Sequence, residues 1–353
     1  MTCPAPLTDV PLHQHNSFGI ASTARWLLPL TDPSQFTEAV DLARLEARRQ
    51  QRAITVLGGG SNVLLDEVIE GPILQVATRG LHFESLGNSD VLMHVEAGEP
   101  WHDVVTQSAA AGLWGIENLS LIPGTVGAAP VQNIGAYGSD ISQCLAEVRA
   151  IDVRTAIEHT FAANQCAFDY RDSRFKREAG QWLITRVTLR LSRTGKARTD
   201  YPGVAAALIA SGLASPDSAS PAQVVNAIAE IRRRKLPDPA VIGNAGSFFK
   251  NPQVSTEIAS QLSLDWPKLP TFAVERSEER KLSAAWMIEA CGWKGHRQGA
   301  VGVSDQHALV LVNHGGGRAR DLLALAADII ASVEQRFGVT LEREPVFING
   351  SMP

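Results

Sequence analysis

Two glycine-rich stretches near the N-terminus have the composition of ligand-binding loops. The segment Leu119–Gly138 carries four glycines and two prolines, and it contains no charged residue. A loop so rich in glycine, and too apolar to be a solvated linker, packs its backbone against a large aromatic ligand or against the protein's own interior. Both interpretations are open for this segment alone.

The second stretch, Gly58–Asn62 (Gly-Gly-Gly-Ser-Asn), follows the apolar run Ala53–Leu57, which we expect to be a buried strand. It is no P-loop, because no Gly-Lys-Ser/Thr follows. It is no Rossmann fingerprint either, because Val76–Arg79 occupies the place of the expected acidic residue. Its successive N–H groups can form an anion nest for a pyrophosphate, with Ser61 and Asn62 as further partners. The alternative is a tight glycine turn without a ligand.

Length and composition restrict the class of protein. A chain of 353 residues is too long for one ordinary core and indicates two or three domains. The net charge of −5 argues against nucleic acid as a partner. The four cysteines form no Cys-x-x-Cys pair and the nine histidines lack ligand spacing, so we expect a reducing compartment and no metal site. We see no signal peptide and no apolar run of about 20 residues, and therefore expect a cytoplasmic protein with no membrane partner.

Hydrophobic periodicity and turn residues predict a mixture of helices and strands of the α+β class. We expect residues before Asn16, including His13 and His15, to form a mobile arm, and the latter part of Ser192–Pro221 to be a domain boundary. The expected helices are Asp32–Arg49, Trp101–Ala111, Gln223–Lys235, Ala284–Cys291 and Asp321–Phe337. The expected strands are Trp26–Leu30, Ala53–Leu57, Val91–Glu96, a meander of Val148–Val153, His159–Phe161 and Gln181–Leu191, then His307–Asn313 and Leu341–Ile348.

Five stretches, in this order, closely resemble the UDP-N-acetylenolpyruvoylglucosamine reductases, the MurB family of peptidoglycan synthesis. Each motif alone is of moderate specificity, whereas the ordered set is highly specific and extends over nearly the whole chain. The stretches are Asn16–Gly19, Gly58–Asn62, Ile122–Gly127 with Gln132–Gly138, Tyr170–Ser173 and Gly243–Pro252.

The resemblance implies a two-lobed FAD-binding domain of the vanillyl-alcohol-oxidase (PCMH) type, followed by a C-terminal α+β substrate domain. We place the first lobe at residues 1–80, joined by a C-terminal strand near 338–349, the second lobe at 81–220, and the substrate domain at 221–337. Thr199–Gly203 lies where longer members of the family carry a tyrosine loop. Tyr201 is thus expected to close over the substrate, the alternative being an exposed turn tyrosine.

The implied activity is reduction of the enolpyruvyl ether of UDP-N-acetylglucosamine-enolpyruvate to UDP-N-acetylmuramate. NADPH is the implied reductant and FAD the non-covalent cofactor, in a cytoplasmic monomer that serves cell-wall synthesis. By resemblance, FAD would be lined largely by backbone groups of Gly58, Gly59, Gly60, Ser61, Asn62, Gly124, Thr125, Gly127, Asn133, Gly135, Ala136 and Tyr137.

Three residues match the family's catalytic positions. Ser247 matches the proton donor, and a hydrolase role is disfavoured because Ala245 replaces the first glycine of a nucleophile elbow. Arg171 matches the active-site arginine, whose guanidinium fork suits a carboxylate. A structural ion pair of Arg171 with Asp172 is the alternative.

Glu344 matches the second glutamate of the family's closing Leu-Glu-x-Glu motif. Glu342 and Glu344 would project from the same face of a strand, so the residues alone do not separate them. Pro345 replaces the usual valine and removes a backbone donor, which predicts that this strand is an edge or ends there.

Two further residues, Lys235 and Asn251, match positions that contact phosphate groups of the substrate or the nicotinamide cofactor. Lys235 ends the basic run Arg232–Lys235. For its three arginines we favour the ordinary role of cations in a last helical turn, where they complement the helix dipole.

Two alternative functions are less consistent with these motifs. A flavin-dependent sugar or alcohol oxidase would share the cofactor loops, but it would not need the Gly243–Pro252 motif and would react with oxygen. A non-catalytic flavin- or nucleotide-binding protein would have no reason to carry Arg171, Ser247 and Glu344 together.

Overall fold

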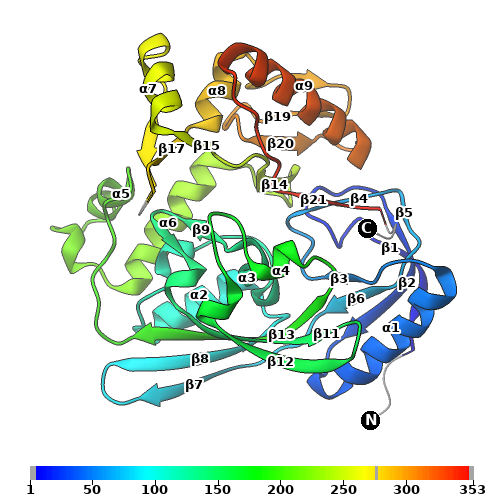
Figure 1. Ribbon diagram of the computed structural model, residues 1–353. Coiled ribbons are helices and arrows are strands. Elements are labelled where there is room, and N and C mark those ends of the chain that lie inside the picture. Colours follow the sequence, from blue (N-terminus) through cyan, green and yellow to red (C-terminus); the bar gives the residue numbers. More distant parts are fainter. Residues whose placement is uncertain (1–4, 275–276, 350–353) are drawn as a thin grey trace.

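The computed structural model describes residues 5–274 and 277–349. Figure 1 shows the C-terminal helices α7, α8 and α9 grouped above two five-stranded sheets, which belong to the first 192 residues. Helices and strands are mixed throughout, as the α+β prediction requires. No helix within the described ranges is long and apolar enough to span a bilayer.

The N-terminal sheet has the order β1–β2–β6–β3, with β5 paired to β2. Asp32 caps the 3-10 helix η1, because its carboxylate accepts from Ser34 N at 2.9 Å, and α1 follows directly at Phe36. The predicted start signal at Asp32 is confirmed for η1. The prediction of a mobile arm is wrong for residues 7–12, because β1 pairs antiparallel with β2 and Leu12 is fully buried. The elements are β1 Leu7–Pro11, β2 Thr23–Leu30, η1 Pro33–Gln35, α1 Phe36–Gln50, β3 Thr55–Leu57, β4 Val63–Leu65, β5 Val68–Ile69 and β6 Ile73–Val76.

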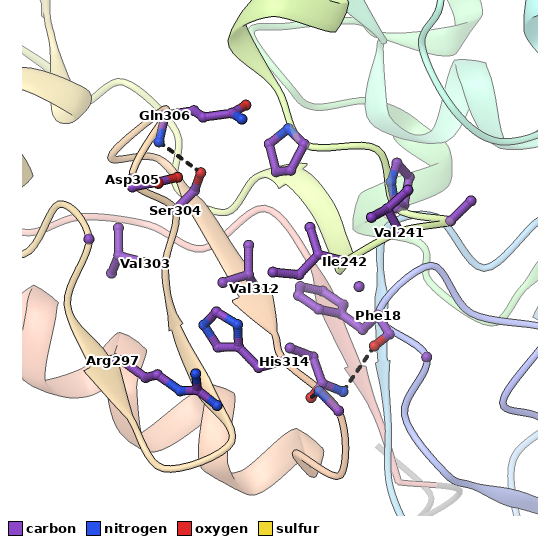
Figure 2. A pocket seen from close by; sticks show the side chains of 18 residues that line it. Phe18, Val241, Ile242, Arg297, Val303, Ser304, Asp305, Gln306, Val312 and His314 are labelled. Carbon is purple, nitrogen blue, oxygen red and sulfur yellow. Dashed lines mark hydrogen bonds between the residues drawn. The ribbon is translucent and has the colours of Figure 1, made fainter.

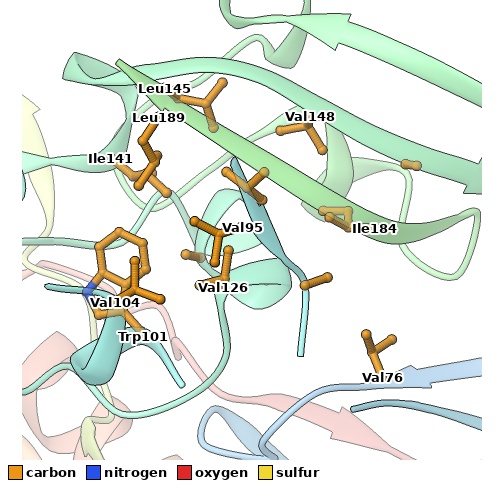
Figure 3. Packing of buried hydrophobic residues seen from close by; sticks show 14 of the residues in the cluster. Val76, Val95, Trp101, Val104, Val126, Ile141, Leu145, Val148, Ile184 and Leu189 are labelled. Atoms are coloured by element: carbon orange, nitrogen blue, oxygen red, sulfur yellow. The ribbon is translucent and has the colours of Figure 1, made fainter. Parts of the chain in front are cut away.

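The second sheet is antiparallel, in the order β12–β11–β13–β8–β7, and contains the three strands predicted as a meander. The meander itself is wrong, because β13 pairs with β11 and not with β12. Its inner face packs on α2 and on the uncharged loop that the sequence singled out, as the labelled side chains in Figure 3 show. Val126 of that loop is fully buried, and Trp101 Nε1 donates to Leu119 O at 2.9 Å. The elements are β7 Leu81–Leu86, β8 Asp90–Glu96, α2 Trp101–Ala110, η2 Glu117–Leu119, η3 Val126–Ala128, α3 Ala129–Gln132, β9 Gly135–Ala136, β10 Ser139–Asp140, η4 Ile141–Gln143, β11 Leu145–Asp152, β12 Ile157–Ala162, η5 Ala163–Cys166, α4 Arg174–Arg177 and β13 Trp182–Ser192.

Helix α6 (Pro221–Lys235) packs on α2 and on α5 (Val204–Ala210). Ser220 caps it in a capping box with Gln223, so the helix begins at the proline as the capping rule predicts. Ser120 Oγ donates to Val225 O at 3.1 Å, which ties α6 to the uncharged loop. The expected boundary segment before it contains α5 and η6 (Pro216–Ser218).

The C-terminal part has a sheet of order β14–β20–β19–β18 and a second of order β15–β17–β16. Its core contains Phe248 and Phe249 together with the apolar faces of α8 and α9. Both helices confirm the predictions, whereas the strand predicted over His307–Asn313 begins only at Val310. The elements are β14 Gly243–Ser247, β15 Gln253–Ser255, α7 Thr256–Asp265, β16 Thr271–Ala273, β17 Glu279–Leu282, α8 Ala284–Ala290, β18 Arg297–Gln298, β19 Val301–Val303, β20 Val310–Asn313, α9 Ala319–Phe337 and β21 Val346–Ile348.

The turn Ser17–Phe18 joins the N-terminal lobe to the C-terminal sheet. Ser17 O accepts from Asn244 N at 3.0 Å, and Phe18 O accepts from Asn313 Nδ2 at 3.0 Å. A Cβ at Gly243 would lie 2.1 Å from Phe18 O, so only glycine permits this close approach.

The closing strand predicted over Leu341–Ile348 is wrong as a single strand, because it changes partners at Pro345. Before the proline, Glu344 N donates to Phe248 O at 2.9 Å. After it, β21 pairs in parallel with β4. A residue without an N–H fits this exchange, and the predicted interruption at Pro345 is confirmed.

Candidate active site

A cavity of about 600 Å³ opens between the glycine turn (Gly58–Asn62), the uncharged loop (Leu119–Gly138) and β21. This volume lies within the usual range for small-molecule and cofactor sites. Of the residues predicted to line a cofactor, Gly58–Asn62, Thr125 and Gly127 contribute to its wall. The other predicted cofactor residues are not among the described residues that line it, although Gly124 lies against Ser61. They are Gly124, Asn133, Gly135, Ala136 and Tyr137.

The glycine turn presents free polar groups at this cavity. The N–H groups of Gly59, Gly60 and Ser61 make no backbone hydrogen bond to the described residues. Gly60 has φ +62°, and a buried oxygen, Thr125 Oγ1, has no partner in the described part of the chain. Such a row of amides suits a pyrophosphate. Apolar walls suit flat rings, and they come from Leu57, Val63, Val76, Val131 and Trp182. The residues therefore fit FAD.

The same glycines let two loops touch each other. A Cβ at Gly58 would lie 2.5 Å from Thr125 Oγ1, and one at Gly124 would lie 2.6 Å from Ser61 Oγ. The two interpretations of the uncharged loop thus combine: its apolar side chains are buried in the protein, and its glycine side forms a cavity wall.

Arg171 is held by the backbone of the uncharged loop. Its Nη2 donates to Gly135 O, and Nη1 donates to Asn133 O at 3.4 Å. A Cβ at Gly135 would lie 2.7 Å from Nη1, so this glycine makes room for the guanidinium. The alternative pair with Asp172 is absent from the described residues, because Asp172 binds Arg177 instead.

Glu344 faces this guanidinium. Its Oε1 lies 3.7 Å from Arg171 Nε, and its Oε2 accepts from Gln132 Nε2 at 3.0 Å. Burial raises the pKa of Glu344, and the nearby Arg171 opposes that rise. The structure separates the two glutamates by exposure: the Glu344 side chain is 13% exposed, whereas that of Glu342 is 66% exposed and pairs with Lys250.

Ser247 ends β14, opposite Val310. The preceding Gly246 has φ +69°, and its N–H donates to Asn244 Oδ1 at 2.9 Å, which turns the chain before the serine. The carbonyl of the next residue, Phe248, accepts from Glu344 N. Ser247 therefore lies on the segment adjacent to Glu344.

Tyr170 links the predicted Asn251 to the arginine. Its ring lies 5.4 Å from Arg171 Cζ and 4.0 Å from Lys281 Nζ. Asn251 hydrogen-bonds Tyr170, and its Oδ1 accepts from Ala284 N at 3.0 Å. Burial lowers the pKa of Lys281, with Arg171 as a further cause. Sequence reasoning missed Lys281, because it lies in a polar hairpin that carries no distinctive signal.

The predicted gate Tyr201 packs edge-on against Tyr137, with ring centroids 5.1 Å apart. It is 46% exposed. Lys235 is exposed at the end of α6, whereas Arg232 is largely buried beside Tyr137, and burial lowers its pKa. Arg232 lies in the last turn of α6, as the helix-end interpretation predicts, but its side chain is not exposed like that of Lys235. Its spacing of four and seven residues from Ile228 and Val225 would have placed it on the buried face.

A separate cavity of about 780 Å³ lies between the Phe18–Gly19 turn, the Pro237–Gly243 loop and strands β19 and β20. Figure 2 shows Arg297 and His314 at one side of it and Ser304, Asp305 and Gln306 at the other. None of the predicted site residues contributes to its described lining. Within the described ranges there is also no group of three His, Cys, Asp or Glu side chains that could hold a metal ion.

Two family models match the chain. Residues 33–160 match an FAD binding domain, and residues 238–348 match the C-terminal domain of UDP-N-acetylenolpyruvoylglucosamine reductase. The reductase of Pseudomonas putida is 43% identical over 337 residues, covering 96% of this chain and 97% of its own. That of Pseudomonas aeruginosa is 46% identical over 334 residues, covering 95% and 96%. The crystal structure of the reductase from Thermus caldophilus shares the fold, with a TM-score of 0.64 at 22% identity, covering 97% of this chain and all of the other.

Arg171→Met is expected to raise the pKa of Glu344 further, because the guanidinium favours the ionised carboxylate. When folding raises the pKa of a carboxyl group, the folded protein loses stability as the pH rises. The free energy of unfolding of the variant should therefore decrease as the pH increases from the ordinary glutamate pKa to the raised one. Carboxyl ¹³C NMR titration measures the shift, with Arg154→Met, which removes the exposed partner of Asp152, as the control. An unchanged or lower Glu344 pKa in Arg171→Met would contradict the pairing.

Proposed function

Because the chain belongs to the UDP-N-acetylenolpyruvoylglucosamine reductase family, we propose that it reduces the enolpyruvyl ether of UDP-N-acetylglucosamine-enolpyruvate to UDP-N-acetylmuramate for peptidoglycan synthesis. It is an oxidoreductase that uses FAD and NADPH. The observation that carries the proposal at atomic level is the Arg171–Glu344 pair, which Gln132 joins to the cavity wall through its hydrogen bond to Glu344.

The cofactor cavity divides into parts with different tasks. The amides of Gly59–Ser61 would bind the pyrophosphate, and the apolar walls would enclose the rings. FAD held there would supply the hydride for the methylene carbon of the enolpyruvyl group, with NADPH as the source of that hydride. Gln132 lines this cavity and its Nε2 donates to Glu344 Oε2 at 3.0 Å, so it connects the cavity wall to the Arg171–Glu344 pair.

Arg171 is the residue we propose to bind the substrate carboxylate. Addition of hydride to the methylene carbon leaves an electron pair on the neighbouring carbon, delocalised into the carboxylate as an enolate. A guanidinium already fixed on Gly135 O and Asn133 O can stabilise that charge without rearranging. Glu344, at 3.7 Å from Nε, would orient the fork from its other edge.

Ser247 is the proposed proton donor. Its hydroxyl would protonate the carbon of the enolate and be restored by a proton from solvent, which balances the addition of H⁻ and H⁺ across the double bond. A serine hydroxyl is a weak acid, so it serves only against a strongly basic carbon. Ser247 directly precedes Phe248, whose carbonyl accepts from Glu344 N, and this position next to Glu344 supports the role.

The remaining predicted contacts involve the substrate and FAD. We propose that Tyr201 closes over the substrate, with Lys235 and Asn251 toward phosphate groups, and that Asn133, Gly135, Ala136 and Tyr137 contact FAD beyond the described lining of the cavity. We also propose a cytoplasmic monomer without a nucleic-acid partner. The division at residues 1–80, 81–220 and 221–337 stays a proposal, since α6 packs on α2 of the second lobe.

Ser247→Ala tests the proton donor. The variant should lose flavin absorbance on anaerobic addition of NADPH at the wild-type rate, because that step needs no proton from Ser247. Return of the absorbance with the enolpyruvyl UDP-sugar should slow by about 100-fold or more, as for loss of a general acid. Stopped-flow spectroscopy separates the two steps. Equal slowing of the NADPH step would rule out the assignment.

Tyr201→Phe tests the gate. Phenylalanine keeps the edge contact with Tyr137 and loses only the hydroxyl. The KM for the UDP-sugar should rise about tenfold, the loss expected for one hydrogen bond, while FAD content stays unchanged. Steady-state kinetics and the ratio of flavin to protein absorbance measure both. A fall in FAD content with an unaltered KM would show instead that Tyr201 belongs to the cofactor site.

A further inference from the structure

We infer that Lys176 is a positioning residue for Arg171, tying the backbone of that arginine to the wall of the cofactor cavity. Lys176 Nζ donates to Arg171 O at 3.0 Å, and the same side chain contributes to the lining of the cavity. This inference rests on the proposed function, because it assigns a role in orienting the residue that binds the substrate carboxylate.

Arg171 has an unfavourable backbone conformation. Asp169 and Asp172 exchange hydrogen bonds of 3.0 and 3.1 Å, which closes a two-residue turn with Tyr170 and Arg171 at its tip. The φ of Arg171 is +54°, in the left-handed region that glycine prefers at this turn position. A non-glycine residue in this conformation is strained, so neighbouring contacts must hold it.

The side chain of Lys176 starts from a firmly anchored helix. Ser173, which is fully buried, caps α4 by accepting from Lys176 N at 3.2 Å. Its hydroxyl donates in turn to Val131 O at 2.8 Å, and Val131 belongs to α3 in the cavity wall. The helix is thereby fixed on α3, and the lysine reaches back five residues to the Arg171 carbonyl.

Charged side chains from several segments act on the ammonium group of Lys176. Glu344, Glu342 and Asp172 favour its ammonium form and Lys250 opposes it, while burial lowers its pKa. Lys176 and Gln132 both line the cavity, and Gln132 binds Glu344. Arg171 is thus contacted at both ends: Lys176 binds its backbone carbonyl, and Glu344 faces its guanidinium.

Rapid-mixing spectroscopy of Lys176→Met and Lys176→Gln tests the inference in the FAD-loaded protein. Reduction by NADPH should stay within about twofold of wild type. Reoxidation by the enolpyruvyl UDP-sugar should slow by about 100-fold, the loss associated with a misplaced catalytic group. Lys176→Arg, which retains a donor for the Arg171 carbonyl, should recover most of that rate. Arg174→Met is the matched control, because Arg174 lies on the same helix and pairs with Glu178.

Three results would overturn the inference. Wild-type reoxidation in both Lys176→Met and Lys176→Gln would show that Arg171 needs no such restraint. Loss of bound FAD or equal slowing of both steps would show a structural role in the cavity wall. Equal slowing in Arg174→Met would show a general effect of α4. If the wild-type protein itself is not reoxidised by the UDP-sugar, the proposed function fails rather than the role of Lys176 alone.

Discussion

The backbone of Glu344 joins parts of the chain that lie far apart in sequence. Its N–H donates to Phe248 O of the C-terminal domain, and its carbonyl accepts from Asn62 Nδ2 of the glycine turn at 3.2 Å. Its carboxylate binds Gln132 of the uncharged loop. One residue thus fixes the cofactor turn, the segment that carries Ser247 and the loop that holds Arg171. Pro345 permits the arrangement, because the chain changes strand partners where the proline has no N–H to satisfy.

This junction has an electrostatic cost that only close pairing offsets. A half-buried carboxylate is disfavoured in its ionised form, and the guanidinium at 3.7 Å with the amide of Gln132 compensates in part. Arg171 in turn adopts a left-handed conformation and relies on Gly135 for space. Strain and burial of this kind persist where the surrounding structure determines them fully, and they gather at functional sites.

Much of this could be predicted from sequence, because local signals were strong. The cap at Asp32, the helices at α2, α8 and α9, and the interruption at Pro345 follow from side-chain chemistry within a few residues. Long-range pairing has no such signal. The N-terminal strand depends on β2, Glu344 is distinguished from Glu342 only by contacts with residues 132 and 171, and Arg232 is buried by packing on Tyr137. Lys176 and Lys281 are ordinary lysines until the fold brings them to Arg171 and Tyr170.

The visible spectrum of the purified wild-type protein is the most direct test of the proposed reductase activity. It is recorded as isolated, after anaerobic NADPH, and after the enolpyruvyl UDP-sugar is added. Flavin bands should disappear with NADPH and return with that sugar in the absence of oxygen. Bands that disappear with NADPH but return only with air would indicate an oxidase. A colourless protein that cannot be loaded with FAD would contradict the assignment of the cavity between the glycine turn and the uncharged loop.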